Sequence, residues 1–116
     1  LVLDEYNNQC CISGYSATTA IEVAHIIPYY GIESDVIYNV IPLRVDLHRL
    51  FDQGLIRIEY SIPAKAFKVH IHHNVFQDYA AFDGQLLIKP SNPLSIPSKI
   101  AIDEHNKQFK ELWTVI

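Results

Sequence analysis

The chain has 116 residues, of which 49% are hydrophobic and 19% are charged, a composition that excludes a disordered protein. Its formal charge of −4 argues against broad, nonspecific binding of nucleic acid, which usually needs a basic face. No apolar run approaches the roughly 20 residues of a membrane-spanning helix, so we expect no contact with a membrane.

The two cysteines, Cys10 and Cys11, are adjacent, and a disulfide between neighbours strains the peptide that joins them. We expect both thiols to be reduced, which suits a cytoplasmic protein. The chain contains no repeat, charge block or flexible linker, and it does not begin with methionine. We therefore expect residues 1–116 to form a single domain taken from a longer chain.

The first part of the sequence predicts two strands separated by a loop. Apolar, β-forming residues run up to Pro28, which stops the first strand. Pro42 lies inside the second strand and favours an edge position or a bulge there, because proline cannot donate a ladder hydrogen bond. In chain order we expect a helix end at residues 1–8, a turn at 10–14, a strand at 20–27, a loop at 29–38 and a strand at 40–44.

A helix is expected directly after the second strand, at residues 46–53. Asp46 is a candidate N-cap, and Gly54 stands where a helix C-cap is expected. Apolar residues recur there with the i, i+3, i+4 spacing of one helix face: Leu47, Leu50 and Phe51.

The second half of the sequence predicts a hairpin followed by helical segments. Two stretches alternate apolar and polar residues, as strands with one buried face do. The final helix has an amphipathic pattern and a plausible cap at Ser98. We expect strands at 55–60 and 66–72, a weak helix at 76–83, an extended proline-rich segment at 89–98 and a helix at 98–114. The fold class is therefore α+β.

Chemistry-bearing side chains concentrate between residues 25 and 52. His25 ends the first strand, and a rigidly held imidazole can serve as a general base near neutral pH. His48 and Asp52 are four residues apart on the predicted helix, which puts both on one face, where they can share a divalent cation. Asn39 precedes the second strand, and its amide can hydrogen-bond across the loop.

These motifs resemble the HNH endonuclease family, also called the ββα-metal nucleases. The stretch Ala24-His-Ile-Ile-Pro28 is similar to the AHI-x-P first strand of a branch found in bacterial restriction-type proteins, and residues 46–55 are similar to its DLHxLFDxGL helix. The spacing of His25, Asn39 and His48 matches the pattern that names the family. The resemblance implies a ββα-metal core with an additional β-hairpin and a C-terminal helix.

The resemblance also implies roles for individual residues. His25 would be the general base, Asn39 the loop brace and His48 a metal ligand, with Asp52 as a second ligand. Many relatives carry a further ligand directly before the base, where this sequence has Ala24. Asp46 and Glu22 are weaker candidates to complete the metal shell. One imidazole and one carboxylate favour magnesium or manganese, with zinc or nickel as alternatives.

The activity implied by the resemblance is metal-dependent hydrolysis of DNA phosphodiester bonds, with 5′-phosphate and 3′-hydroxyl products. A restriction or defence protein would use such a cleavage module, with its DNA-recognition domain elsewhere in the full-length chain. Two alternatives remain open at this point: a non-catalytic DNA- or protein-binding module with a vestigial site, and an RNA-directed nuclease toxin. The acidic net charge and Ala24 favour the first alternative.

Other polar and aromatic residues have two readings each. Arg44 and Arg49 flank the predicted site and are candidates for phosphate contact, or are ordinary surface charges. Further candidates have a functional and a structural interpretation. Tyr29 and Tyr30 could stack on bases or cover a core edge. His70 and His72 could bind metal or lie on a solvated edge strand, and His105 is expected at a polar position on the last helix.

Overall fold

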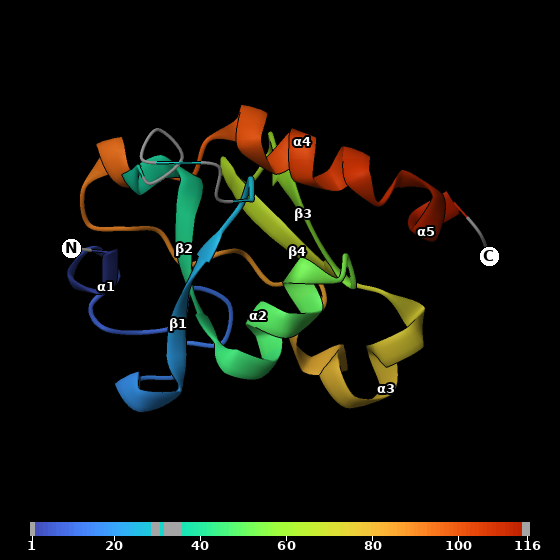
Figure 1. Cartoon of the computed structure of the whole chain (residues 1–116), viewed down its shortest axis with the longest axis horizontal. Coiled ribbons are helices and arrows are strands. Elements are labelled where there is room, and N and C mark those ends of the chain that lie inside the picture. Colours follow the sequence, from blue (N-terminus) through green and yellow to red (C-terminus); the bar gives the residue numbers. More distant parts are fainter. Residues whose placement is uncertain (1, 29–30, 32–35, 115–116) are drawn as a thin grey trace.

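The computed structural model describes residues 2–28, 31 and 36–114. Its central unit is a pair of antiparallel strands, called here the β-ribbon, followed directly by a helix. Strand β1 (Ile21–His25) pairs antiparallel with β2 (Val40–Arg44), in a register that sets Ile21 opposite Arg44 and His25 opposite Val40. Helix α2 (Val45–Asp52) follows β2 without a break. The two predicted strands and the helix are therefore confirmed (Figure 1). Most of the loop expected at 29–38 lies outside the described residues.

Pro42 fits the middle of β2 because this sheet has two strands, so β2 has a free edge. The carbonyl of Pro42 accepts a hydrogen bond from the Cys11 backbone N–H at 2.9 Å, which fastens the 10–14 turn to the strand. The edge position that Pro42 predicts is confirmed. Both cysteines are buried and free of disulfides, as expected.

Helix α2 begins one residue earlier than predicted, and Asp46 is not its N-cap. Arg44 takes the N-cap position without a side-chain cap, and the Asp46 carboxylate accepts hydrogen bonds from Arg44 Nε at 2.7 Å and Nη2 at 3.0 Å. The Tyr79 hydroxyl donates to the same carboxylate at 2.9 Å. Asp46 still lies in the first turn, where a negative charge favours the helix dipole.

The predicted hairpin is also confirmed. Strands β3 (Ile56–Ser61) and β4 (Ala66–Ile71) pair antiparallel, and an isolated bridge joins Lys68 to Leu86. The weak helix expected at 76–83 is a run of short helical turns. These turns are a 3₁₀ turn at His73–Val75, helix α3 (Phe76–Tyr79) and a 3₁₀ turn at Ala80–Phe82.

The single C-terminal helix predicted at 98–114 is instead two helices, α4 (Lys99–Gln108) and α5 (Lys110–Thr114). Ser98 caps α4 as predicted, because its hydroxyl accepts from the Ala101 N–H at 3.2 Å. The chain turns at Phe109, and α5 then docks on the end of α2, where Trp113 Nε1 donates to the Gly54 carbonyl at 2.7 Å. Periodicity could not show the break, because both halves have helical patterns.

Helix α2 contacts β1, β2 and β3, so it joins the β1–β2 ribbon to the β3–β4 hairpin. Helix α4 packs against β3 (Figure 1). Helix α1 (Val2–Glu5) contacts β2, and shorter 3₁₀ turns at Thr18–Ala20, Ile37–Asn39 and Pro93–Ser95 complete the described elements. No helix within the described residues is long and apolar enough to cross a membrane. The largest fully buried core side chains include Tyr6, Ile26, Leu43, Leu47, Phe51, Ile58 and Ile102.

Candidate active site

His48 lies between two carboxylates. Its Nδ1 is 2.8 Å from Glu22 Oε1 on β1, and its Nε2 is 3.2 Å from Asp52 Oδ2 one turn further along α2. The His48 side chain is 21% exposed, whereas both carboxylates are more than half exposed. The ribbon and the helix thus hold the imidazole from both sides while its edge stays open to solvent.

A pocket of about 400 Å³ brings the predicted base and metal ligands together. His25, His48 and Asp52 all line it. A second hollow of about 320 Å³ shares His48 and Asp52 with this pocket and also includes Glu22 and Arg49. The site residues predicted on β1 and on α2 therefore line one pocket.

Asn39 is buried and joins the segment after β1 to the start of β2. Its Oδ1 accepts from the Ile27 N–H at 2.9 Å, and its Nδ2 donates to the Ile27 carbonyl at 3.2 Å. The Asn39 backbone carbonyl accepts from the Ile26 N–H at 2.8 Å. These three bonds continue the ribbon just beyond His25, so the end of β1 is held firmly.

The donor set at His48 and Asp52 fits two adjacent ligands of a divalent cation. Two ligands at right angles on a cation with bonds of about 2.1 Å lie about 3 Å apart, close to the observed 3.2 Å. Glu22 faces the opposite ring nitrogen, which is where metal-bound histidines commonly hold a carboxylate that orients the ring. Within the part of the chain that the structure describes, no three His, Cys, Asp or Glu side chains are grouped to hold a metal.

The other positions considered for the metal shell do not join the pair formed by His48 Nε2 and Asp52. Ala24 is fully buried in the core, and Asp46 is held by Arg44 and Tyr79. The Arg44 guanidinium holds the pKa of Asp46 below its ordinary value of 3.8. Glu22 contacts His48 but from the nitrogen that faces away from Asp52, so it acts on the ring's orientation.

The two predicted phosphate-binding arginines differ in their surroundings. Arg49 borders the hollow that contains Glu22, His48 and Asp52. Arg44 pairs with Asp46, and its guanidinium lies over the rings of Tyr15 at 5.6 Å and Phe82 at 5.5 Å. Arg44 would have to leave these partners to reach a phosphate.

His70 and His72 do not form a metal site. His70 Nε2 pairs with Glu59 at 3.2 Å on the half-exposed face of the hairpin. His72 is buried and fully hydrogen-bonded: its Nε2 lies 3.0 Å from the Leu112 carbonyl, and its Nδ1 accepts from the Asn74 N–H at 3.1 Å. The reading of His72 as a solvated strand residue is therefore wrong, because α5 covers it. Tyr29 and Tyr30 lie outside the described residues.

His105 is a site residue that the sequence reading missed. It lines the same pocket as His25, His48 and Asp52, although it lies on α4 and is buried. The helical pattern alone predicted only a polar position on the last helix. Its burial depends on how α4 packs against α2, which no local pattern reveals.

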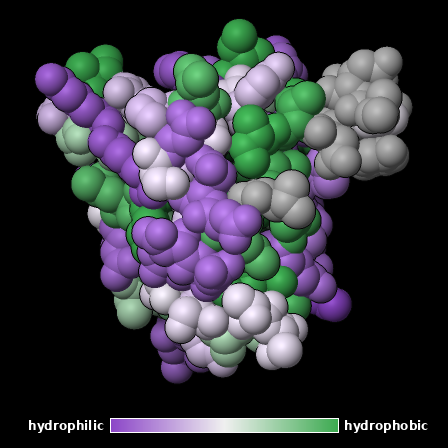
Figure 2. Space-filling model, turned by 90° about the vertical axis from the view of Figure 1, so that its left-hand side faces the viewer, coloured by the Kyte–Doolittle hydropathy of each residue, from purple (hydrophilic) through white to green (hydrophobic). Residues whose placement is uncertain are grey.

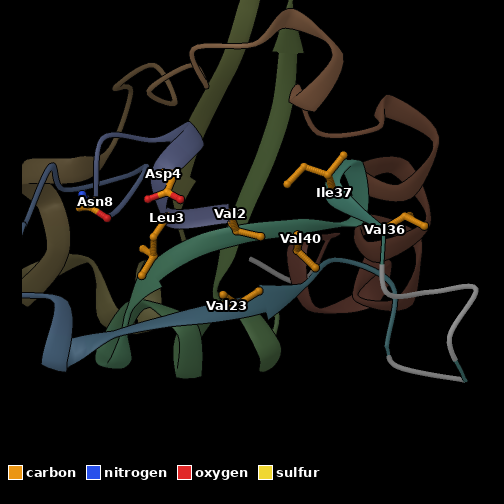
Figure 3. A pocket seen from close by; sticks show the side chains of 8 residues that line it. All are labelled: Val2, Leu3, Asp4, Asn8, Val23, Val36, Ile37 and Val40. Carbon is orange, nitrogen blue, oxygen red and sulfur yellow. The ribbon is translucent and has the colours of Figure 1, made fainter.

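A larger pocket of about 700 Å³ lies at the end of the molecule that carries α1. Figure 2 shows hydrophobic side chains gathered on this face. Figure 3 shows valine and leucine side chains from α1, β1 and β2, together with Val36 and Ile37 from the segment before β2, around the pocket. Asp4 is its one ionisable lining residue among those described. A pocket without a base or a ligand pair has no means of hydrolysis, so the histidine pocket is the candidate active site.

A β-ribbon followed by a helix, with a histidine from each facing one pocket, is the arrangement expected of a ββα-metal nuclease. Residues 10–59 match the family model described as HNH endonuclease. This match confirms, over that segment, the resemblance to the HNH endonuclease family seen in the sequence.

The fold has a solved counterpart, described as a modification dependent TagI restriction endonuclease. The two structures align with a TM-score of 0.60 and 22% sequence identity, over 92% of this chain. The chain spans 35% of the length of that protein. A comparison with curated proteins found no match.

Proposed function

We propose that this chain is a metal-dependent endonuclease module that hydrolyses DNA phosphodiester bonds within a restriction-type protein. The observation that carries the proposal is the shared pocket, where His25 from β1 meets the His48 and Asp52 pair from α2. The HNH family match and the fold of a restriction endonuclease support the same conclusion. Recognition of the DNA target would belong to another domain of the full-length protein.

The reaction follows from the positions of these groups. His25 takes a proton from a water molecule, the water oxygen attacks the phosphorus in line, and the 3′ oxygen leaves. The products are a 5′-phosphate and a 3′-hydroxyl. A divalent cation held by His48 and Asp52 would stabilise negative charge on the phosphate, and magnesium or manganese suits this donor set better than zinc or nickel.

Three further residues support this chemistry without taking part in proton transfer. Glu22 orients the His48 ring, and Asn39 holds the end of β1 that carries His25. Arg49 borders the site and can reach a phosphate, whereas Arg44 can do so only after leaving Asp46. Removal of Arg49 should therefore weaken binding of the substrate more than removal of Arg44.

Plasmid cleavage tests the proposal. The chain is incubated with supercoiled DNA and Mg²⁺, Mn²⁺, Zn²⁺ or Ni²⁺, beside His25→Ala, His48→Ala and the control His70→Ala. We expect His25→Ala to lose about 10²–10⁴ in rate while its Mn²⁺ affinity, measured by calorimetry, stays close to that of the wild type. His48→Ala should lose both activity and affinity, and His70→Ala should lose neither.

Two outcomes would favour the alternatives. Cleavage of RNA with no action on DNA would identify an RNA-directed nuclease. Failure to cleave either substrate with any of the four metals would identify a non-catalytic module with a vestigial site, which the buried Ala24 would explain. Direct religation of the cut ends by DNA ligase tests for 5′-phosphate and 3′-hydroxyl products.

A further inference from the structure

The end of α4 has a fixed position against α2. The His105 ring stacks on Phe51 with ring centroids 3.9 Å apart, and the Phe109 ring lies where a Cβ of Gly54 would stand. Phe51 and Gly54 lie on either side of Asp52 in the sequence. The end of α4 is therefore held beside the part of α2 that carries the proposed metal ligands.

Gln108 adds a polar side chain from this end of α4 to the pocket that contains His25, His48 and Asp52. It is the last residue of α4, it lines the pocket, and it is exposed to solvent. Its side-chain amide makes no hydrogen bond with another described residue, so both of its N–H donors are available to a ligand. Glutamine is among the side chains that commonly donate to phosphate oxygens in DNA complexes.

A phosphodiester in this pocket would present acceptor oxygens, and the other polar side chains there do not supply donors for them. An ionised Asp52 only accepts hydrogen bonds. His48 would hold the cation, and His25 as the general base needs its lone pair for water. His105 Nε2 is buried, so a ligand does not reach it. Among the described residues that line the pocket, Gln108 is the side chain with donors for a phosphate.

Nearby cations do not take this position. Arg49 lines the second hollow and is not among the residues around the pocket itself. Lys107 precedes Gln108 but pairs with Glu104 at 3.7 Å, and it does not line the pocket. A neutral donor therefore faces the substrate from α4, which agrees with the acidic net charge of the chain.

We propose that Gln108 is a substrate-binding residue, whose side-chain amide donates a hydrogen bond to a phosphate oxygen of the DNA strand in the pocket. This inference rests on the proposed nuclease function. It adds a contact from α4, beyond the segment 10–59 that matches the HNH model, to the site formed by β1 and α2.

Cleavage of short DNA duplexes tests this contact, with substitutions of Gln85 as controls. Gln85 is exposed, lies outside both hollows among their described lining residues, and donates to the Ala81 carbonyl at 2.9 Å. We expect Gln108→Ala to raise KM about 5- to 10-fold and to leave kcat and Mn²⁺ affinity close to the wild type, since a binding contact acts on ground and transition states alike. Gln85→Ala should change none of these quantities.

A second measurement does not depend on activity. Fluorescence anisotropy without added metal gives the DNA affinity at several salt concentrations. Each phosphate neutralised by a cation steepens the plot of log affinity against log salt by about 0.9. Gln108→Lys, which exchanges a neutral donor for a cationic one, should tighten binding and steepen the plot by about that amount, whereas Gln85→Lys should not.

The outcomes separate this inference from its alternatives. An active wild type whose KM does not change in Gln108→Ala would overturn it, and so would equal steepening by Gln108→Lys and Gln85→Lys, which would identify net charge as the cause. A loss restricted to particular DNA sequences would indicate a base contact in place of the phosphate contact. A wild-type chain that cleaves nothing would overturn the proposed function, while a steeper plot for Gln108→Lys alone would still support the contact with DNA.

Discussion

Glu22 and His48 are 26 positions apart in the sequence, yet Glu22 Oε1 and His48 Nδ1 lie 2.8 Å apart. The imidazole is only 21% exposed and is held by carboxylates on both of its nitrogens, from Glu22 and from Asp52. The carboxylate on Nδ1 turns the other nitrogen toward Asp52 and the pocket. The site therefore depends on a contact between β1 and α2 as much as on the residues that would touch the metal.

Replacement of Glu22 by glutamine should weaken metal binding. The amide keeps the shape of the side chain but loses the negative charge of the carboxylate that orients the ring. Loss of such a partner typically costs 10–100-fold in affinity, and we expect about 10-fold because Glu22 is more than half exposed. Calorimetric titration with Mn²⁺ measures the change.

Glu59→Gln is the matched control for this experiment. Glu59 also pairs with a histidine from an exposed strand position, at 3.2 Å from His70 Nε2, but it lies outside both hollows that His48 lines. Its replacement should leave Mn²⁺ affinity unchanged. Equal losses in the two variants would point to net charge, rather than orientation of His48, as the cause.

At the scale of elements, Gly54 joins α2 to the C-terminal helices. Its φ of +76° is the left-handed conformation that ends the helix, and the Phe109 ring lies where a Cβ would stand. The Gly54 carbonyl accepts the Trp113 Nε1–H at 2.7 Å. Gly54 therefore ends α2, leaves space for the Phe109 ring and binds α5 through Trp113.

Gly54→Ala should destabilise the fold through two effects. Left-handed backbone strain at a non-glycine residue costs about 1–3 kcal/mol, and displacement of Phe109 adds to it. Gly84→Ala isolates the first effect, because Gly84 has a similar φ of +82° and nothing within 4 Å of its added Cβ. In urea unfolding, the free energy of unfolding should be clearly lower for Gly54→Ala than for Gly84→Ala. Equal losses of unfolding free energy in the two variants would refute the contribution of Phe109.

The start of α2 should show a dependence of stability on pH through Asp46. The hydrogen bond from Arg44 is the main reason that the pKa of Asp46 is lower in the folded protein than its ordinary 3.8. A lowered folded-state pKa stabilises the fold above the unfolded-state value, and this contribution is lost as the pH falls below about 3.8. The pair is partly exposed, so the contribution is at most about 1 kcal/mol.

Asp46→Asn tests this expectation, with Asp103→Asn as a control in an exposed helical ion pair. The melting temperature of Asp46→Asn should lie below that of the wild type at pH 6, and the gap should close toward pH 3. A gap that stays constant across this range would mean that Asp46 acts through its hydrogen-bonding shape and not through its charge.

At the scale of the whole molecule, the charge of −4 sets an expectation for DNA binding. Nonspecific binding is dominated by cation contacts with phosphates, and its dissociation constants are typically 10⁻⁴–10⁻⁶ M at physiological salt. We expect this chain to bind duplex DNA no more tightly than about 1 µM. Fluorescence anisotropy at several salt concentrations measures this, and nanomolar affinity would contradict recognition by a separate domain.

This chain spans 35% of the length of the restriction endonuclease that has the same fold. A cleavage module that binds weakly by itself acts only where another domain concentrates it on a target. Under the proposed function, a low affinity of the module alone would limit cutting at unintended sites.

The sequence by itself determined the order of the β1, β2 and α2 elements and the candidate residues His25, Asn39, His48 and Asp52. These features depend on short-range rules: strand alternation, proline and glycine stops, and the four-residue spacing that puts two side chains on one helix face. Such rules act within a few residues of the chain, so a single sequence displays them.

Only the tertiary structure decided the partners of these residues. It paired Glu22 with His48, assigned Asp46 to Arg44, broke the last helix at Phe109 and buried His72 and His105. Each of these outcomes depends on contacts between segments far apart in the chain, and the burial of a polar group is set by what packs over it. The sequence carries that information only through the complete fold.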